Sequence, residues 1–398
     1  MQPVYVTIVY NKEKRDLKLP KVIIVNKDNK NNIIRLYDNN ANKSIKQIKI
    51  ELEKLKTVIL KYNDKGVKIV TDCFRNLVDA LQLPLDMREY NVYDMHIHEM
   101  LYDEDGINLR IGELQKRELR NYQKVLANSS IVFADMEKKG LYYNFSHVKP
   151  VWTQDTYSGR SKSTGFNIQG FTEHAKIQNI SSLETDMLIH FDWICADIRV
   201  ASILSDDENL KKSFARSDPY KYLMKSLNNS RKEKGLEETF DRDECKLILL
   251  KGINSLDFRS MVFTNVYPRL GEWMSDVSSS DVSETMLGRK FHVTDEKNRL
   301  SVFNGVMQGS VAHAMQSVLR RVWLKLQDRL VCDVHDSIVL NVGNNRNDLM
   351  AVMKIVSEIM LDPFMTGDIF PIKVSIGKRW REYKNIATIY NHNDLSVL

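Results

Sequence analysis

Two aspartates lie at the ends of apolar strands expected from the sequence. Their carboxylates are ligands that hard metal ions prefer. Asp192 follows the apolar run from Met187 to Phe191, and Asp336 lies at the tip of a hairpin expected over residues 330–342. Paired carboxylates suit Mg²⁺, which prefers oxygen ligands, and a site for two ions needs bridging carboxylates because the ions repel each other. Taken alone, either aspartate is equally consistent with an acidic turn residue that binds no metal. If the two converge, the sequence predicts a magnesium site.

Two cations with helical spacing form the second candidate group. Arg242 and Lys246 are four residues apart within the segment 241–255, so on a helix both project from one face, and Leu250 and Asn254 continue that row. Arginine binds phosphate as a planar fork and lysine as a point charge, so the pair can grip a triphosphate. A solvated basic helix face is the alternative interpretation.

These residues need a framework, and the hydrophobic pattern predicts a mixed α/β and α+β chain. Residues 1–100 predict the order β-β-β-α-β-α, with the first helix over 45–62. Residues 113–140 predict a helix that ends at its final glycine, which suits the left-handed position after a helix C-terminus. Residues 146–182 read as ordered loop with short strands, and from 183 onward strands alternate with long helices.

Composition limits the classes of protein to consider. The chain has 398 residues, of which 43% are hydrophobic and 28% charged, so we expect two or three globular domains and exclude disordered and fibrous classes. There is no run of roughly 18 apolar residues and no cationic leader, which predicts a cytoplasmic protein with no membrane partner. The net charge of +6 favours a polyanionic partner without requiring one.

Several motifs occur together in one order. Asp192 comes with Asp197 and Arg199, and the pair Arg242 and Lys246 follows. The other matching segments are SGRSKSTGFNIQ with Arg160, Asn167 and Gln169, then ETMLGRKF, NGVMQGSVAHAM, VHDS and PIKVSIGKRWREY. In this order and spacing the chain resembles family A DNA polymerases, the group that contains bacterial DNA polymerase I. The resemblance covers about residues 131–384.

The resemblance implies a role for each matching residue. Asp192 and Asp336 would hold two metal ions, Mg²⁺ with Mn²⁺ as the alternative, and Trp193 would lend its backbone carbonyl. Arg242 and Lys246 would lie on the fingers helix that closes over the incoming nucleotide, where Lys246 could also protonate the leaving pyrophosphate. The positions that match contacts to primer, template or the nascent base pair are Arg160, Asn167, Asn304, Gln308 and His335.

The positions expected to bind the incoming nucleotide depart from the family's pattern. The glutamate that excludes a ribose 2′-hydroxyl falls at Asp197, whose side chain is shorter by one methylene. Leu250 replaces the aromatic residue beside the sugar, and Asn254 replaces a helix tyrosine, while Trp193 completes this group. We therefore expect altered sugar discrimination. Ser337 replaces the acid after His-Asp, a form that also resembles single-subunit phage and mitochondrial RNA polymerases.

The resemblance also implies the domain organisation. We expect a degenerate RNase H-like 3′-5′ exonuclease-type domain over 1–112, a connecting helix with a remnant thumb over 113–182, and polymerase palm and fingers over 183–398. The first strand lacks the acidic pair that an exonuclease needs, so we expect no proofreading. Only about 20 residues separate Gly140 from Arg160, where the family has a long helical thumb. We therefore expect little or no thumb.

Together these expectations define a template-directed DNA polymerase that adds dNTPs to a primer 3′-hydroxyl. Its partners would be primer-template DNA, dNTPs and a protein that supplies grip or processivity. A phage origin would place it in the host cytoplasm, with an organelle as a further option. Two alternatives stay open at this point: a single-subunit RNA polymerase or primer-synthesising enzyme, and a catalytically silent nucleic-acid-binding replication scaffold.

Overall fold

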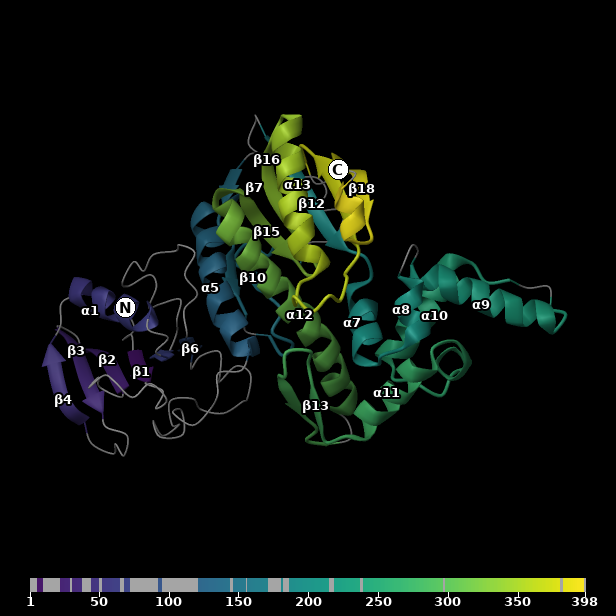
Figure 1. Ribbon diagram of the computed structural model, residues 1–398, viewed down its shortest axis with the longest axis horizontal. Coiled ribbons are helices and arrows are strands. Elements are labelled where there is room, and N and C mark those ends of the chain that lie inside the picture. Colours follow the sequence, from purple (N-terminus) through teal and green to yellow (C-terminus); the bar gives the residue numbers. More distant parts are fainter. Residues whose placement is uncertain are drawn as a thin grey trace. The chain divides into compact units, whose positions relative to one another are not determined.

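A computed structural model divides the chain into two compact units, whose elements are labelled in Figure 1. The N-terminal unit comprises Met1–Lys138 and Trp152–Lys162, and the C-terminal unit comprises Lys139–Val151 and Ser163–Leu398. The residues that the structure describes are 6–9, 22–28, 31–37, 44–49, 52–64, 68–71, 92–94, 121–143, 146–154, 156–170, 180–181, 186–214, 218–236, 239–295, 298–379 and 382–396.

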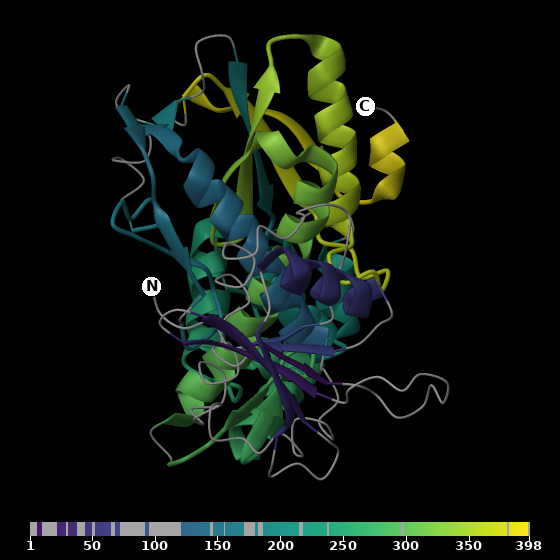
Figure 2. The same ribbon diagram turned by 90° about the vertical axis from the view of Figure 1, so that its left-hand side faces the viewer.

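The N-terminal unit contains a six-stranded sheet in the order β4-β3-β2-β1-β5-β6, shown in purple and blue in Figure 2. Neighbouring strands are antiparallel except β5 and β6, which are parallel. The strands are β1 (Val6–Val9), β2 (Val22–Asp28), β3 (Asn31–Tyr37), β4 (Ser44–Lys49), β5 (Lys68–Thr71) and β6 (Val92–Asp94).

The helix expected over 45–62 is wrong at its start. Helix α1 spans Leu52–Asp64, and the preceding residues form β4, which pairs with β3. The apolar spacing in this segment runs across the boundary between strand and helix, so periodicity alone did not reveal the break. Backbone hydrogen bonds to β3 decide the conformation of residues 44–49 instead.

Helix α5 (Asn121–Lys139) confirms the later part of the helix expected over 113–140, while residues 113–120 lie outside the described part of the chain. Within the N-terminal unit, Phe133 of this helix stacks on Trp152 with ring centroids 6.0 Å apart. Gly140 follows the helix with φ +67°, and a Cβ there would lie 2.4 Å from the carbonyl oxygen of Val148. This left-handed, crowded position requires glycine, as the sequence predicted.

The C-terminal unit is built on a five-stranded antiparallel sheet in the order β15-β16-β12-β17-β18. Its central strand is β12 (Asp186–Trp193), an eight-residue segment whose inner side chains are fully buried. The other strands come from the C-terminal third of the chain: β15 (Leu330–Val334), β16 (Ser337–Gly343), β17 (Ile372–Gly377) and β18 (Lys384–Ile389).

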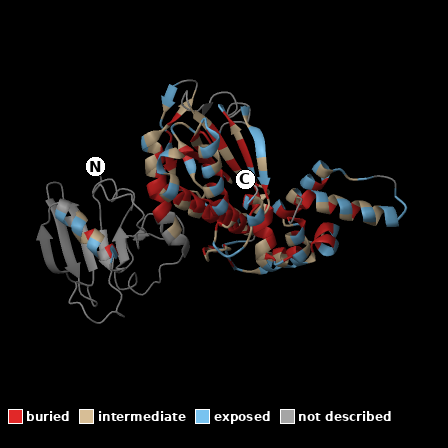
Figure 3. Cartoon of the chain, turned by 45° about the horizontal axis from the view of Figure 1, so that its top comes forward, coloured by how far each residue is buried: buried red, intermediate tan, exposed pale blue. Residues whose placement is uncertain are grey.

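Helices α12 and α13 pack on each other, and α13 packs on β16 and β17 of this sheet. Figure 3 shows the buried residues concentrated in the sheet and α12, whereas α9 and α10 carry many exposed residues. The helices are α7 (Ala196–Leu204), α8 (Glu208–Ser213), α9 (Pro219–Glu233), α10 (Arg242–Asn254), α11 (Pro268–Ser279), α12 (Arg299–Leu326) and α13 (Arg346–Leu361).

Short elements complete the described part of the chain. Strands β7 (Leu141–Tyr143), β8 (Ser146–Val148) and β11 (Ile180–Ser181) form a small sheet, and β13 (Val282–Glu284) pairs with β14 (Lys290–His292). The remaining ones are β9 (Val151–Thr153), β10 (Lys162–Thr164), the π-helical turn η2 (Val262–Val266) and the 3₁₀ turns η4 (Gln327–Arg329) and η6 (His392–Ser396). Among the helices described, none combines the length and apolar character that a membrane crossing requires.

Candidate active site

The fold places Asp192 near the end of β12 and Asp336 in the turn that leads into the neighbouring strand β16. In the antiparallel ladder between β12 and β16, Asp192 lies opposite Ser337, the residue after Asp336. The backbone N–H of Trp193 donates to the backbone carbonyl of Asp336, with a nitrogen–oxygen distance of 3.2 Å. Two residues that are remote along the chain are therefore held side by side by main-chain hydrogen bonds.

Asp336 occupies a two-residue turn between β15 and β16. His335, the other turn residue, has φ +60°, and the Ser337 hydroxyl donates to the carbonyl of Val334 at 3.0 Å. A positive φ at the first turn residue matches the twist that two-residue hairpins need, although glycine is the usual choice there. His335 is exposed, and Asp336 is half-buried. The turn therefore presents the carboxylate at the end of a rigid hairpin.

The donor set around Asp192 and Asp336 fits a hard divalent cation. Both candidate ligands are carboxylates, and Mg²⁺ completes its shell with waters, carbonyls and substrate oxygens. No group of three or more His, Cys, Asp or Glu side chains suited to a metal occurs within the described residues. The side chain of Trp193 is buried, and its Nε1 donates to the Met360 carbonyl at 2.9 Å, which fixes the neighbouring backbone.

Helix α10 carries the candidate phosphate-binding cations on one face. Its first turn is closed by a capping box between Asp241 and Glu244. Lys246 is exposed, while the Arg242 side chain is 40% exposed. The Arg242 Nε lies 2.9 Å from a carboxylate oxygen of Asp218, which caps the N-terminus of α9. The structure therefore shows Arg242 in an ion pair that the sequence did not predict.

The positive charges of α10 act on Cys195, in the segment that follows Asp192. Burial raises the pKa of the Cys195 thiol, while a hydrogen bond from the Tyr220 hydroxyl and the charges of Arg242 and Lys246 lower it. The Arg242 guanidinium also lies over the Tyr220 ring, 5.2 Å from its centroid. Both cations thus act electrostatically on the N-terminus of α7, which follows β12.

The expected nucleotide-binding residues lie on α7 and α10. Asp197 is in the first turn of α7 and half-buried, and it follows Asp192 by little more than one helical turn of chain. On α10, Leu250 is half-buried and Asn254 is exposed at the last position. Helix geometry places both on the face that carries Lys246.

The residues expected to contact nucleic acid are distributed over three segments. Asn304 and Gln308 lie one turn apart on α12 and are half-buried between fully buried neighbours. The Asn167 side chain accepts hydrogen bonds from the Gly170 backbone N–H at 2.8 Å and from the Ser163 hydroxyl at 3.3 Å, so it shapes its own loop. Arg160 belongs to the N-terminal unit, and its role remains a prediction.

Gln169 connects this loop to the hairpin strand that precedes Asp336. Its side-chain oxygen accepts from the Ser163 backbone N–H at 3.0 Å, and its Nε2 donates to the Asp333 carbonyl at 3.5 Å. Gln169 is buried, and so is Asp333. The loop over 163–169 is therefore anchored against β15.

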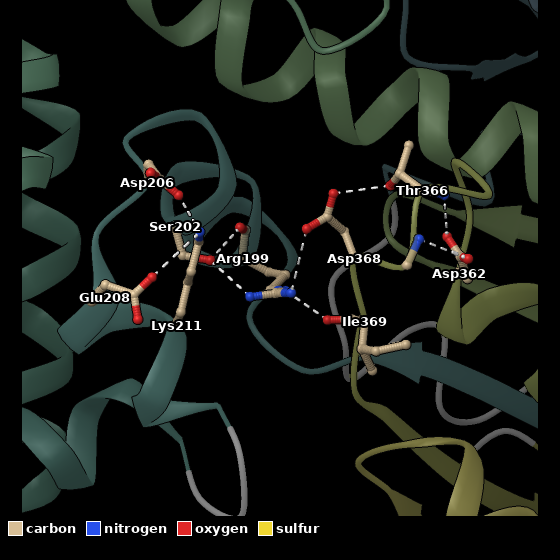
Figure 4. A network of polar contacts seen from close by, with 10 residues as sticks. Arg199, Ser202, Asp206, Glu208, Lys211, Asp362, Thr366, Asp368 and Ile369 are labelled. Carbon is tan, nitrogen blue, oxygen red and sulfur yellow. Dashed lines mark hydrogen bonds and ion pairs between the residues drawn. The ribbon is translucent and has the colours of Figure 1, made fainter.

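Arg199 connects α7 to the segment around Asp368 and Ile369, as Figure 4 shows. Its Nε donates to the Ile369 carbonyl at 2.6 Å, its Nη1 donates to the Ser202 hydroxyl at 3.0 Å, and its Nη2 lies 4.0 Å from Asp368. The guanidinium also lies over the ring of Phe214 at 5.5 Å. Burial lowers the pKa of Arg199, and Asp368 opposes this effect. This buried network fixes the helix that follows Asp192.

Sequence reasoning missed two residues of the site. Asp218 carries a readable signal, since an aspartate before proline is typical of a helix start. Lys373 carries none, because its position depends on strand register: it lies on β17 directly opposite Asp192. Only the pairing of β12 with β17 reveals that neighbour.

Comparisons with known proteins agree with the resemblance noted in the motifs. No protein-family model matches the chain. A curated protein described as a thermostable DNA polymerase I from Thermus filiformis is 22% identical over 266 residues, which cover 58% of this chain and 32% of that protein. The chain therefore spans about a third of the length of this relative.

A solved structure has a similar fold. It is described as the POL domain of Pol1 from M. smegmatis in complex with DNA primer-template and dNTP. The TM-score is 0.51 at 14% identity, and the match covers 83% of this chain and 66% of that one. Part of the chain is thus similar in sequence to a DNA polymerase I, and its fold is similar to that of a Pol1 polymerase domain.

Proposed function

We propose that the chain is a template-directed DNA polymerase that adds dNTPs to a primer 3′-hydroxyl. The observation that carries the proposal is the adjacency of Asp192 and Asp336, joined by the hydrogen bond from Trp193 N–H to the Asp336 carbonyl. The charges of Arg242 and Lys246 on α10 act on the Cys195 thiol, which lies in the segment that follows β12. The names of the two similar proteins, a DNA polymerase I and a polymerase domain with primer-template and dNTP, support the same activity.

In this proposal Asp192, Asp336 and the backbone carbonyl of Trp193 hold two divalent ions, Mg²⁺ or Mn²⁺. Such ions, when bound, lower the pKa of the attacking hydroxyl and neutralise charge on the leaving pyrophosphate. Lys246 holds a proton on Nζ that it can give to the pyrophosphate oxygen, and Arg242 binds the phosphates as a planar fork. Arg242 must leave Asp218, or share it, to do so.

Selection of the nucleotide sugar rests on α7 and α10. Asp197 lies in the first turn of α7, and Arg199 of the same helix donates to the Ile369 carbonyl. A carboxylate one methylene shorter than glutamate leaves more room beside a ribose 2′-hydroxyl, and Leu250 adds no aromatic face against the sugar. We infer weaker discrimination between dNTPs and rNTPs than a Glu and aromatic pair gives.

The remaining parts of the proposal concern domains and partners. Between Gly140 and Arg160, the described residues form β7, β8 and β9 and no helix. This supports a chain with little or no thumb over 113–182, so a protein partner is needed for grip on duplex product. For residues 1–112 we propose a degenerate exonuclease-like domain without proofreading, and for 183–398 palm and fingers.

Primer extension with Mg²⁺ tests the activity. Wild type and Asp336→Ala are compared with four dNTPs, with four rNTPs and without template, and Ser279→Ala, an exposed site on the same unit, serves as the matched control. We expect template-dependent extension with dNTPs by wild type and control, and none by Asp336→Ala. Preferential use of rNTPs would favour an RNA polymerase or primer-synthesising enzyme. Equal results for wild type and Asp336→Ala, active or inactive, would reject the site.

A further inference from the structure

Lys373 is a cationic neighbour of Asp192 that the proposed chemistry does not use. In the ladder between β12 and β17, Lys373 pairs with Asp192, and on the other side of β12 the partner of Asp192 is Ser337. Residues directly opposite on antiparallel strands point to the same face of the sheet. One row across three strands therefore runs from Ser337 through Asp192 to Lys373.

The Lys373 side chain is exposed on β17. Ile372 and Val374 on either side of it are fully buried, and Ser375, on the same face as Lys373, is also buried. The four-carbon stem of Lys373 is long enough to turn its ammonium toward Asp192. Strand register and side-chain length thus place a positive charge beside the candidate metal site.

Asp192 is the nearest residue of β12 to Lys373. His190 lies two residues before Asp192 on β12, on the same face. It pairs with Ser375, so it is only a diagonal neighbour of Lys373, while Asp192 is the direct one.

We propose that Lys373 tunes the metal affinity of the site: it offsets the mutual repulsion of Asp192 and Asp336 before an ion binds, and it weakens their hold on a divalent cation. This inference rests on the proposed function. A like charge beside a bound ion raises the dissociation constant, whereas a cation beside two carboxylates stabilises the ion-free pair. Lys373 acts through Asp192 and is a positioning residue, not a catalytic one.

The size of the effect follows from distance. Directly opposite residues have Cβ atoms about 4.5–5.5 Å apart, so the ammonium lies within about 10 Å of an ion on Asp192. At that distance, in water with salt, the repulsion between the singly charged ammonium and the doubly charged ion changes the affinity for the ion about two- to sixfold. The predicted effect is therefore small, but a direct binding measurement can resolve it.

The test is titration of the full chain with Mn²⁺ alone, without DNA or nucleotide, followed by electron paramagnetic resonance of the free ion. We expect Lys373→Met to bind Mn²⁺ about two- to sixfold more tightly than wild type, and Lys373→Arg to bind as wild type does. The matched control is Lys384→Met, because Lys384 is exposed at the far end of β18, four residues from Thr388, the partner of Lys373.

The variant Asp192→Asn distinguishes failure of the proposed metal site from failure of the inference about Lys373. If Asp192→Asn weakens Mn²⁺ binding but Lys373→Met leaves it unchanged or weaker, the inference about Lys373 is overturned and the metal site stands. If Asp192→Asn binds Mn²⁺ as wild type does, the ion is held elsewhere and the proposed function fails with it. Tighter binding by Lys373→Met together with loss in Asp192→Asn supports both.

Discussion

Backbone strain lies beside each of the two aspartates. Cys195, shortly after Asp192, has φ 56° and ψ 50° and begins the turn into α7, and His335, just before Asp336, has φ +60°. Residues other than glycine seldom adopt this left-handed conformation, and such residues cluster at functional sites. The sequence contains no glycine at either turn, so it predicted the aspartates but not the strained turns that aim them.

Lys246→Ala tests the role of the exposed cation on α10. If its charge meets negative charge that grows in the transition state, the rate of nucleotide addition should fall about 10²- to 10³-fold. The measurement is single-turnover primer extension at saturating dNTP. Lys251→Ala is the matched control, because Lys251 is also exposed on α10 but lies on another face. A loss below about threefold in Lys246→Ala would reject the assignment.

Asp218→Asn tests the ion pair that holds Arg242. Asparagine also caps helices, so α9 keeps its N-cap contact to the Lys221 N–H while Arg242 loses its charged partner. We expect the KM for dNTP to fall about two- to fivefold with kcat unchanged, because the triphosphate no longer competes with Asp218 for the guanidinium. Steady-state primer extension gives both constants. A higher KM would show instead that the pair positions Arg242 for the phosphates.

At the scale of elements, the sequence predicted those whose ends carry local signals. Helix α10 starts after Asp241 with Glu244 in its first turn, and the hairpin around Asp336 separates two apolar strands. By contrast, residues 44–49 form β4 because they pair with β3. Lys373 lies opposite Asp192 because β17 pairs with β12. Pairing between distant segments produces no periodic pattern in the sequence. Neither the strand β4 nor the position of Lys373 beside Asp192 could therefore be predicted from a single sequence.

Asp348 joins the start of α13 to the end of the sheet. It accepts a hydrogen bond from the Gly343 N–H at 2.7 Å and from Arg329 at 2.6 Å. Asp348→Asn keeps the size of the side chain but removes its charge, so we expect the free energy of unfolding to fall by about 1–2 kcal/mol at pH 7. Urea unfolding measures this, with Asp276→Asn, an exposed carboxylate on α11, as the control.

The same contact predicts a pH dependence. The hydrogen bond from Arg329 holds the pKa of Asp348 below its usual value of 3.8. A carboxyl group whose pKa is depressed on folding stabilises the protein above its unfolded pKa and loses that contribution as the pH falls through the folded one. The difference between wild type and Asp348→Asn should therefore be full at pH 7 and shrink below about pH 4. An equal difference at both pH values would contradict the role assigned to the charge.

At the scale of the whole molecule, the carboxylates and cations of the candidate site belong to one unit. The sheet of the C-terminal unit takes β12 from one segment and its other strands from the last third of the chain, and α7 to α11 lie between them in sequence. Folding of this unit alone therefore brings Asp192 and Asp336 together, and Lys246 lies on α10 of the same unit. The proposed lack of a thumb affects a different property, the hold on duplex product, which depends on charge.

The salt dependence of binding to primer-template tests how strongly the chain holds duplex product. Without a thumb we expect about three to five phosphate contacts in all, so the apparent Kd for primer-template should rise about 40- to 500-fold between 50 and 200 mM salt. Fluorescence anisotropy with labelled primer-template measures it, and primer extension should shorten over the same range because the chain dissociates after few additions. Asp336→Ala should show the same salt slope, since the metal ligands touch no remote phosphate. Long products from the purified chain at physiological salt would mean that the chain grips duplex by itself and needs no partner for it.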